Sequence, residues 1–185
     1  MKKTVSTLLA TLMVILAFSA SAQTWNFTVL SAADESNLSA DAANWTLDNS
    51  GTNNRYKNAA AFTDAALKAN GVELETTKGL LFTAPKADAI RCDISGKRLA
   101  MNQNKTVITI PNLTAGSTVT VKCKSSSKTV ARGLNTTNLE PISGDFNSTS
   151  LNDQVNVGTV IADGNVTLTC TGGLYVFSIV VSADG

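Results

Sequence analysis

Short segments of alternating apolar and polar residues recur from residue 72 onward in this 185-residue chain and limit the folds it can adopt. Successive side chains of a β-strand point to opposite faces, so a period of two indicates a strand with one buried face. The pattern recurs at residues 72–76, 79–84, 89–94, 98–102, 106–110, 117–124, 155–161, 165–170 and 174–182. Turn-forming residues separate these segments, and no regular strand–helix alternation appears. The sequence predicts an all-β fold, an antiparallel β-sandwich or jelly roll.

Two of the segments, residues 80–82 and 174–181, are apolar at successive positions. A strand that is apolar on both faces is usually buried on both faces. We therefore expect these two strands to be central and covered on both sides. Phe82 and Phe177 share these strands with aliphatic residues, and Phe27 lies in a similar setting, so all three are expected in the core.

The chain before residue 72 carries weaker signals. Residues 25–30 alternate and predict an opening strand. Ser31 is placed to cap a short helix over residues 32–43, with carboxylates in its first turn. Residues 59–68 have a helical composition and predict a second short helix, which ends at a tight Asn70–Gly71 turn. Residues 45–58 are rich in Asn, Asp, Ser, Thr and Gly, which is typical of an exposed loop.

Residues 1–22 have the features of a secretory signal peptide: a basic start, an apolar run and an Ala20-Ser21-Ala22 cleavage site. The apolar run is shorter than the roughly 20 residues that span a bilayer, so we expect removal rather than membrane insertion. Cleavage before Gln23 leaves residues 23–185 as one β-sandwich domain. The expected location is the periplasm, the cell surface or the medium.

Charge and composition exclude several functions. The net charge is +1 with 16% charged residues, which gives no electrostatic footprint for nucleic acid. The chain has no histidine, which removes the common catalytic triads and histidine-ligated zinc sites. We therefore expect no catalysis and no cofactor. A structural calcium ion is the one metal considered, because the loops at residues 48–54 and 145–147 offer oxygen ligands, although turn formation also explains them.

Three cysteines, Cys92, Cys123 and Cys170, lie in predicted strands on the faces that carry aliphatic residues. Free cysteine is a small hydrophobic residue in such a position. We favour three buried thiols, with a Cys123–Cys170 disulfide as the alternative.

Four groups of residues resemble, in their order, a known exported module. They are Trp25-x-Phe27; residues 69–71 with 77–82; residues 108–116 with Val119-x-Val121; and residues 164–166 with 172–176. Together they resemble the non-catalytic β-sandwich, or carbohydrate-binding-module-like, domain found beside pectate-lyase-like domains in exported proteins of polysaccharide-degrading gut bacteria. A loop at residues 125–127 and 131–133, which carries Arg132, is similar as well. The resemblance implies a galactose-binding-like jelly roll that binds carbohydrate.

A sugar site needs exposed aromatic rings beside hydrogen-bonding side chains. Trp45 and Tyr56 bracket the polar loop beside Arg55, and Arg98, Asn102 and Arg132 are expected at one end of the sandwich, where arginine would suit an acidic sugar. Packing of the two rings and solvation of the charges remain the alternative reading of these residues. The leading hypothesis is a secreted, non-catalytic module for a plant or host polysaccharide. A structural or adhesive protein that contacts another protein is the alternative, and a pectin-active enzyme is less favoured.

Overall fold

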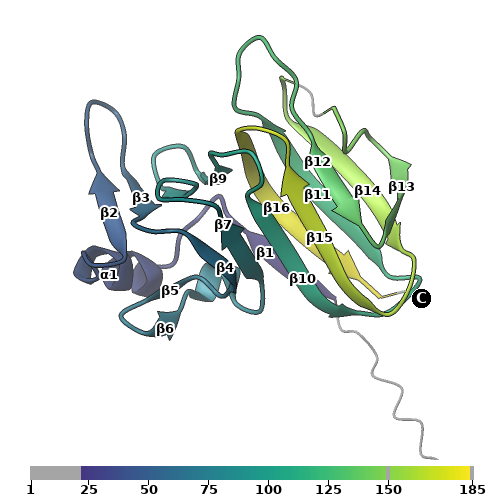
Figure 1. Ribbon diagram of the computed structural model, residues 1–185, viewed down its shortest axis with the longest axis horizontal. Helices are drawn as coiled ribbons and strands as arrows, with labels where there is room; N and C mark the ends of the chain where they lie inside the picture. Colours follow the sequence, from purple (N-terminus) through teal and green to yellow (C-terminus); the bar gives the residue numbers. More distant parts are fainter. Residues whose placement is uncertain (1–21, 149–150, 184–185) are drawn as a thin grey trace, which may run out of the picture.

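The alternating segments form two antiparallel sheets that share one hydrophobic core, as a β-sandwich does. The computed structural model describes residues 22–148 and 151–183, so all but the last residue of the expected signal peptide, residues 1–22, lies outside the described residues. Figure 1 shows the long strands of the second half of the chain packed at one end of the molecule, with the helix α1 at the other end. The prediction of an all-β sandwich is confirmed.

The larger sheet has nine strands. Eight follow one another in the order β13 (Leu139–Ser143), β14 (Gln154–Val160), β11 (Thr118–Ser125), β16 (Leu174–Ser182), β9 (Arg98–Met101), β8 (Ile90–Asp93), β3 (Arg55–Asn58) and β2 (Trp45–Asp48). The ninth, β1 (Gln23–Asn26), pairs with β16. β16 is therefore central, as predicted.

The smaller sheet has five strands, in the order β12 (Leu134–Thr137), β15 (Gly164–Cys170), β10 (Val107–Leu113), β7 (Leu81–Ala84) and β4 (Phe62–Ala65). A two-stranded ribbon, β5 (Lys68–Ala69) and β6 (Val72–Glu73), and the 3-10 helix η1 (Glu75–Thr77) lie near α1 (Ala32–Ala40). The inner faces of both sheets contribute fully buried residues to the core, among them Ile108, Val121, Leu168 and Ile179. Burial of each such side chain contributes about 1.5–3 kcal/mol.

The helix cap predicted from Ser31 is confirmed. Ser31 Oγ accepts a hydrogen bond from the backbone N–H of Asp34 at 2.9 Å, and α1 begins at Ala32. The helix ends at Ala40, three residues before the predicted end. The Asn70–Gly71 turn is also present: both residues have positive φ, 51° and 75°, and they join β5 to β6.

Three predictions for the first half of the chain are wrong. Residues 45–58 form the β2–β3 hairpin rather than a loop, and residues 59–68 contain β4 rather than a helix. Pairing of β4 with β7 overrides the helical composition, with a register shift between Phe62 and Ala65. Residues 72–76 form β6 and the start of η1 rather than one strand, and the opening strand lies at Gln23–Asn26.

The cysteine prediction is confirmed in its favoured form. Cys92, Cys123 and Cys170 are free and buried, so the alternative Cys123–Cys170 disulfide is wrong. Burial raises the pKa of the Cys92 thiol to about 12 and that of Cys123 to about 12. Both groups therefore stay protonated, and unreactive as nucleophiles, at neutral pH.

Because the three thiols are buried, we expect them to react with a thiol reagent only after the protein is denatured. At pH 8 the native protein should react very slowly with 5,5′-dithiobis(2-nitrobenzoate), because the thiolate is the reacting species and the thiols are shielded from solvent. After denaturation the same protein, kept free of reductant, should release three equivalents of product, one for each cysteine. One equivalent after denaturation would reveal a disulfide and contradict the structure.

Candidate functional site

The two aromatic residues expected to stack on a sugar are buried. Trp45 is 4% exposed, and its indole Nε1 donates to the carbonyl oxygen of Lys68 at 2.8 Å. Tyr56 is also 4% exposed. The expectation of surface rings was wrong because both residues belong to the β2–β3 hairpin, whose period of two turns them onto the inner face of the large sheet. Neither ring is a surface platform.

Two of the predicted polar residues, Arg55 and Arg98, lie on the opposite, outer face of the same sheet. The strand register aligns Asp48 with Arg55, Arg55 with Asp93, and Asp93 with Arg98, so charges alternate across four strands. Arg55 Nη2 lies 2.6 Å from Asp48 Oδ2, and Arg98 Nη2 lies 2.7 Å from Asp93 Oδ2. Hydrogen bonds from Ser50 and Arg55 hold the pKa of the Asp48 carboxyl well below its usual value. The row is fixed by ion pairs.

Asn102 and Arg132 are not in this row. The Asn102 side-chain amide donates to the carbonyl oxygen of Asp88 at 3.1 Å. Arg132 lies between β11 and β12, and its Nη1 donates to Ser126 Oγ at 3.1 Å. The structure thus brings together Arg55 and Arg98 but holds Asn102 and Arg132 in contacts with neighbouring turns.

Two aromatic rings that were not expected at the surface lie beside Arg98. Tyr175 and Phe177 of β16 are both partly exposed. Arg98 Cζ lies 3.6 Å from the centroid of the Tyr175 ring, and the Nζ atoms of Lys122 and Lys124 each lie 5.8 Å from the centroid of the Phe177 ring. These distances are within the range of cation–π attraction. We call Arg98, Lys122, Lys124, Tyr175 and Phe177 the aromatic platform.

Phe177 lies on the same face as Tyr175, two residues earlier, and a β-bulge at Phe177 shifts the phase of the strand after it. Lys122 pairs with Ser178 and Cys123 with Val176, so Phe177 is the extra residue in β16. β16 also changes its partner here, from β9 to β1. The expectation that Phe177 lies in the core is therefore wrong, and so is the expectation that both faces of β16 are covered. Tyr175 could have been found from the sequence, because it alternates with the buried residues Leu174 and Val176.

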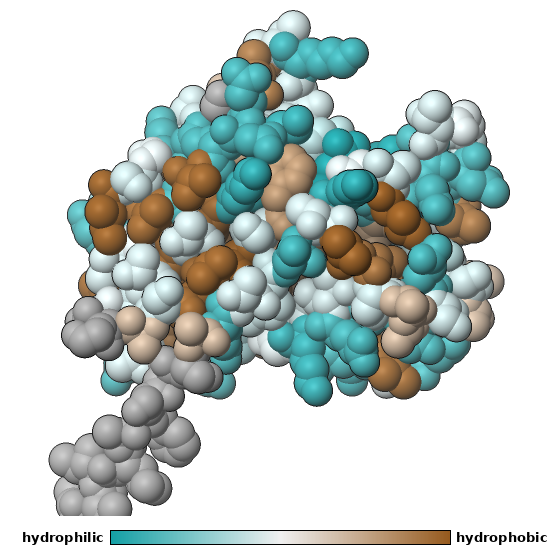
Figure 2. Space-filling view, turned by 180° about the vertical axis from the view of Figure 1, so that it is seen from behind, coloured by the Kyte–Doolittle hydropathy of each residue, from teal (hydrophilic) through white to brown (hydrophobic). Residues whose placement is uncertain are grey.

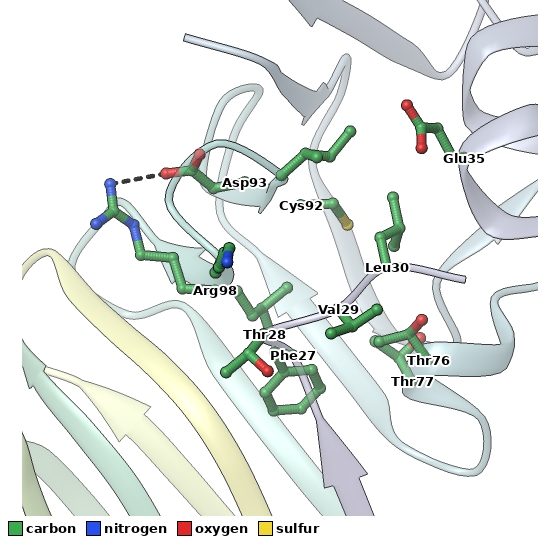
Figure 3. Close-up of a pocket in the computed structure, with 13 residues that line it drawn as sticks. Phe27, Thr28, Val29, Leu30, Glu35, Thr76, Thr77, Cys92, Asp93 and Arg98 are labelled. Atoms are coloured by element: carbon green, nitrogen blue, oxygen red, sulfur yellow. Dashed lines mark ion pairs between the residues drawn. The ribbon is translucent and has the colours of Figure 1, made fainter. Parts of the chain in front are cut away.

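A pocket lies beside the platform and shares Arg98 with it (Figure 3). Its volume is about 220 Å³, and it is lined by the segment that follows β1, by α1, by η1 and by the β8–β9 hairpin. Its lining is mostly apolar and includes Phe27, Val29, Leu30 and Cys92. Figure 3 shows Glu35 and Arg98 on opposite sides of it. Ligand sites usually measure about 300–1,000 Å³, so the pocket fits only a small apolar group.

A second cavity of about 320 Å³ has one edge at Trp45, but its polar groups already have partners. The Asp41 carboxylate accepts hydrogen bonds from the backbone N–H of Asn70 at 2.8 Å and from the amide of Asn44 at 3.0 Å. The Asn58 amide donates to the carbonyl oxygens of Ala60 and Lys86 and accepts from the N–H of Ile90. The Asp41 contacts hold the turn of the small ribbon, and the Asn58 contacts hold the segments after β3 and β7, which leaves little polar capacity for a ligand.

The loops considered for calcium form turns. Asp48 Oδ1 accepts hydrogen bonds from the Ser50 N–H and hydroxyl, and Asp145 Oδ1 accepts from the Asn147 N–H at 2.8 Å. Within residues 22–148 and 151–183, no group of three or more His, Cys, Asp or Glu side chains is placed to hold a metal ion. The same part of the chain contains no helix long and apolar enough to cross a membrane.

No protein-family model matches the chain, and no curated protein matches it. Among solved structures, the chain is similar to one titled "Carbohydrate-Binding Module CBM36 in complex with calcium and xylotriose", with 19% sequence identity and a TM-score of 0.31. The match covers 45% of this chain and 79% of that one. A likeness this slight carries no argument about the ligand, which must be inferred from the platform itself.

Proposed function

We propose that this protein is a secreted, non-catalytic module that binds a polysaccharide on the aromatic platform. The observation that carries the proposal is the pair of partly exposed rings, Tyr175 and Phe177, with three cations beside them on one sheet face. The apolar face of a sugar ring packs on an aromatic ring, while its hydroxyl groups accept hydrogen bonds from Arg and Lys. Aromatic and cationic groups on one face supply both kinds of contact.

The outer face is long enough for an oligosaccharide. Register places Lys124 beside Tyr175, Tyr175 beside Ala100, Ala100 beside Arg91, and Arg91 beside Lys57. Neighbouring strands are about 4.8 Å apart, so this row of five strands spans roughly 19 Å. A polymer chain lying across the strands would meet an aromatic ring at one end and hydrogen-bond donors at the other.

Removal of the rings should weaken binding without unfolding the protein. In a glycan array and in titration calorimetry with the best ligand found, Phe177→Ala and Tyr175→Ala should each weaken binding about tenfold, because a stacking contact contributes about 0.5–1.5 kcal/mol beyond its buried area. Phe62→Ala is the matched control: Phe62 is a partly buried phenylalanine on the other sheet, and its replacement should leave affinity unchanged. Full affinity in the double variant Tyr175→Ala/Phe177→Ala would contradict the proposal.

The alternative of an adhesive protein has one observation in its favour. Ile142 of β13 is 61% exposed, Leu151 is 41% exposed and Val155 of β14 is 50% exposed, near one edge of the large sheet. Figure 2 shows one face of the molecule, on which hydrophobic residues lie in separate patches between hydrophilic ones. Separate patches are common on soluble proteins, whereas a protein-binding face is often one larger apolar area. Self-association in sedimentation, reversed by Val155→Lys, would favour the alternative.

A further inference from the structure

One exposed carboxylate bridges the two lysines of the aromatic platform. Lys122 Nζ lies 3.5 Å from Asp153 Oδ2, and Lys124 Nζ lies 3.6 Å from Asp153 Oδ1. The same two ammonium groups each lie 5.8 Å from the centroid of the Phe177 ring. An aromatic ring, two cations and a carboxylate are thus arranged together at the surface.

From this arrangement we infer that the platform selects a polysaccharide that carries carboxylate groups, and that Asp153 occupies the carboxylate position when the ligand is absent. The inference rests on the proposed function and names the class of ligand. A uronic acid has an apolar ring face and a carboxylate at the ring edge. Phe177 would take the ring face, and Lys122 and Lys124 would take the carboxylate.

The exposure of these groups makes such an exchange feasible. The side chains of Lys122 and Asp153 are 47% and 48% exposed, and that of Lys124 is 32% exposed. Exposed ion pairs are weak, because water screens them and ordering the long side chains costs entropy. A ligand carboxylate can therefore replace that of Asp153 at little cost, and stacking on Phe177 adds a contact that Asp153 does not make.

The charge of the whole outer face favours an anion. Six basic side chains of this sheet are ion-paired, and four carboxylates pair with them: Arg55, Lys57, Arg91, Arg98, Lys122 and Lys124 against Asp48, Asp88, Asp93 and Asp153. The pairs leave two cations in excess, and Glu140 of β13, which its register with Thr159 places on the same face, reduces the excess to one. An excess of positive charge on one face attracts anionic polymers, and salt weakens that attraction.

The ligand class can be tested with one oligomer in two forms. An oligogalacturonate should bind at least tenfold more tightly than the same oligomer with methyl-esterified carboxyl groups, and its affinity should fall as salt is added. The double variant Lys122→Gln/Lys124→Gln should bind both forms equally. Lys68→Gln/Lys86→Gln is the matched control, because both lysines are exposed and lie outside the platform strands, and it should behave as wild type.

Asp153→Asn tests the role of the internal carboxylate. Without the Asp153 carboxylate, the ligand no longer competes for Lys122 and Lys124. Affinity for the oligogalacturonate should therefore rise about twofold to fivefold, and affinity for the ester should stay unchanged. Unchanged or weaker binding of the acid by this variant would overturn the role of Asp153.

Three further outcomes would overturn the inference in distinguishable ways. Tighter binding of dextran sulfate, which has no uronic acid, would show a general anion site rather than one for carboxylates. If the wild-type protein bound the acid and the ester equally, while Phe177→Ala still lowered its affinity, the preference for carboxylates would be wrong. The proposed glycan-binding function would remain supported. Failure of the folded protein to bind any glycan would reject both.

Discussion

Replacement of Trp45 by alanine is expected to lower the free energy of unfolding by about 3–5 kcal/mol. Trp45 is 4% exposed and belongs to the main core cluster. Alanine would leave a cavity between the β2–β3 hairpin and the small ribbon, and the carbonyl oxygen of Lys68 would lose the indole N–H that lies 2.8 Å away. A loss of this size is a large part of the 5–15 kcal/mol that stabilises a typical domain.

Urea unfolding followed by circular dichroism would measure this loss. Leu47→Ala is the matched control, because Leu47 lies on the same strand but is 44% exposed, and it should cost less than about 1 kcal/mol. If Trp45→Ala lowered the free energy of unfolding no more than Leu47→Ala, the buried position of the Trp45 ring would be wrong. Trp45 would then again be a candidate for stacking on a sugar.

Replacement of Asp34 by asparagine should have the second largest effect, about 2–4 kcal/mol. Asp34 is 1% exposed, and its carboxylate accepts hydrogen bonds from the backbone N–H groups of Glu75 at 2.7 Å and Thr76 at 2.8 Å. The Thr76 hydroxyl donates to it as well. The carboxylate thus links α1 to η1. In the asparagine variant, the side-chain NH₂ group would face the backbone N–H groups of η1, and two donors cannot form a hydrogen bond.

The adjacent residue supplies a control for Asp34. Glu35 is exposed in the same first turn of α1, so Glu35→Gln should change stability by less than about 0.5 kcal/mol. Equilibrium unfolding of both variants would give the difference. Equal stabilities for Asp34→Asn and Glu35→Gln would show that the carboxylate does not hold η1.

The strands of the second half of the chain could be predicted from the sequence because they are amphipathic. The segment predicted at residues 174–182 coincides with β16, and those at 155–161 and 165–170 differ from β14 and β15 by one residue. A period of two survives in these strands because one face packs on the core. The cysteines were placed correctly for the same reason, since each shares its face with buried aliphatic residues.

The strands between residues 45 and 76 could not be predicted from the sequence, because they are short and depend on distant partners. β3 pairs with β8, and β4 with β7, so long-range hydrogen bonds decide their structure. The polar sequence of β2 and β3 places Thr46, Asp48, Arg55 and Lys57 on the outer face, which made the hairpin resemble a loop. Strands with four residues each give too short a pattern to outweigh such a composition.

The candidate site was predicted in part. Arg55 and Arg98 were identified from residue type, and both lie on the outer face, but the aromatic partners proposed for them are buried. Phe177 was assigned to the core because it shares its strand with aliphatic residues. The bulge at Phe177 keeps it on the outer face with Tyr175, whereas Ile179, two residues later, lies on the inner face. The contact between Arg98 and Tyr175 joins strands that are more than seventy residues apart in the chain and follows only from the sheet order.

Amide chemical shifts would show which strands of the protein contact an acidic oligosaccharide. ¹H–¹⁵N spectra of the mature protein would be recorded while an oligogalacturonate is added, with the methyl ester as the comparison. We expect the largest shifts on β16, β11 and β9, around Tyr175, Phe177, Lys122 and Arg98, and smaller shifts with the ester. Shifts confined to the second cavity around Trp45 and Asn58, or none at any concentration, would contradict this expectation.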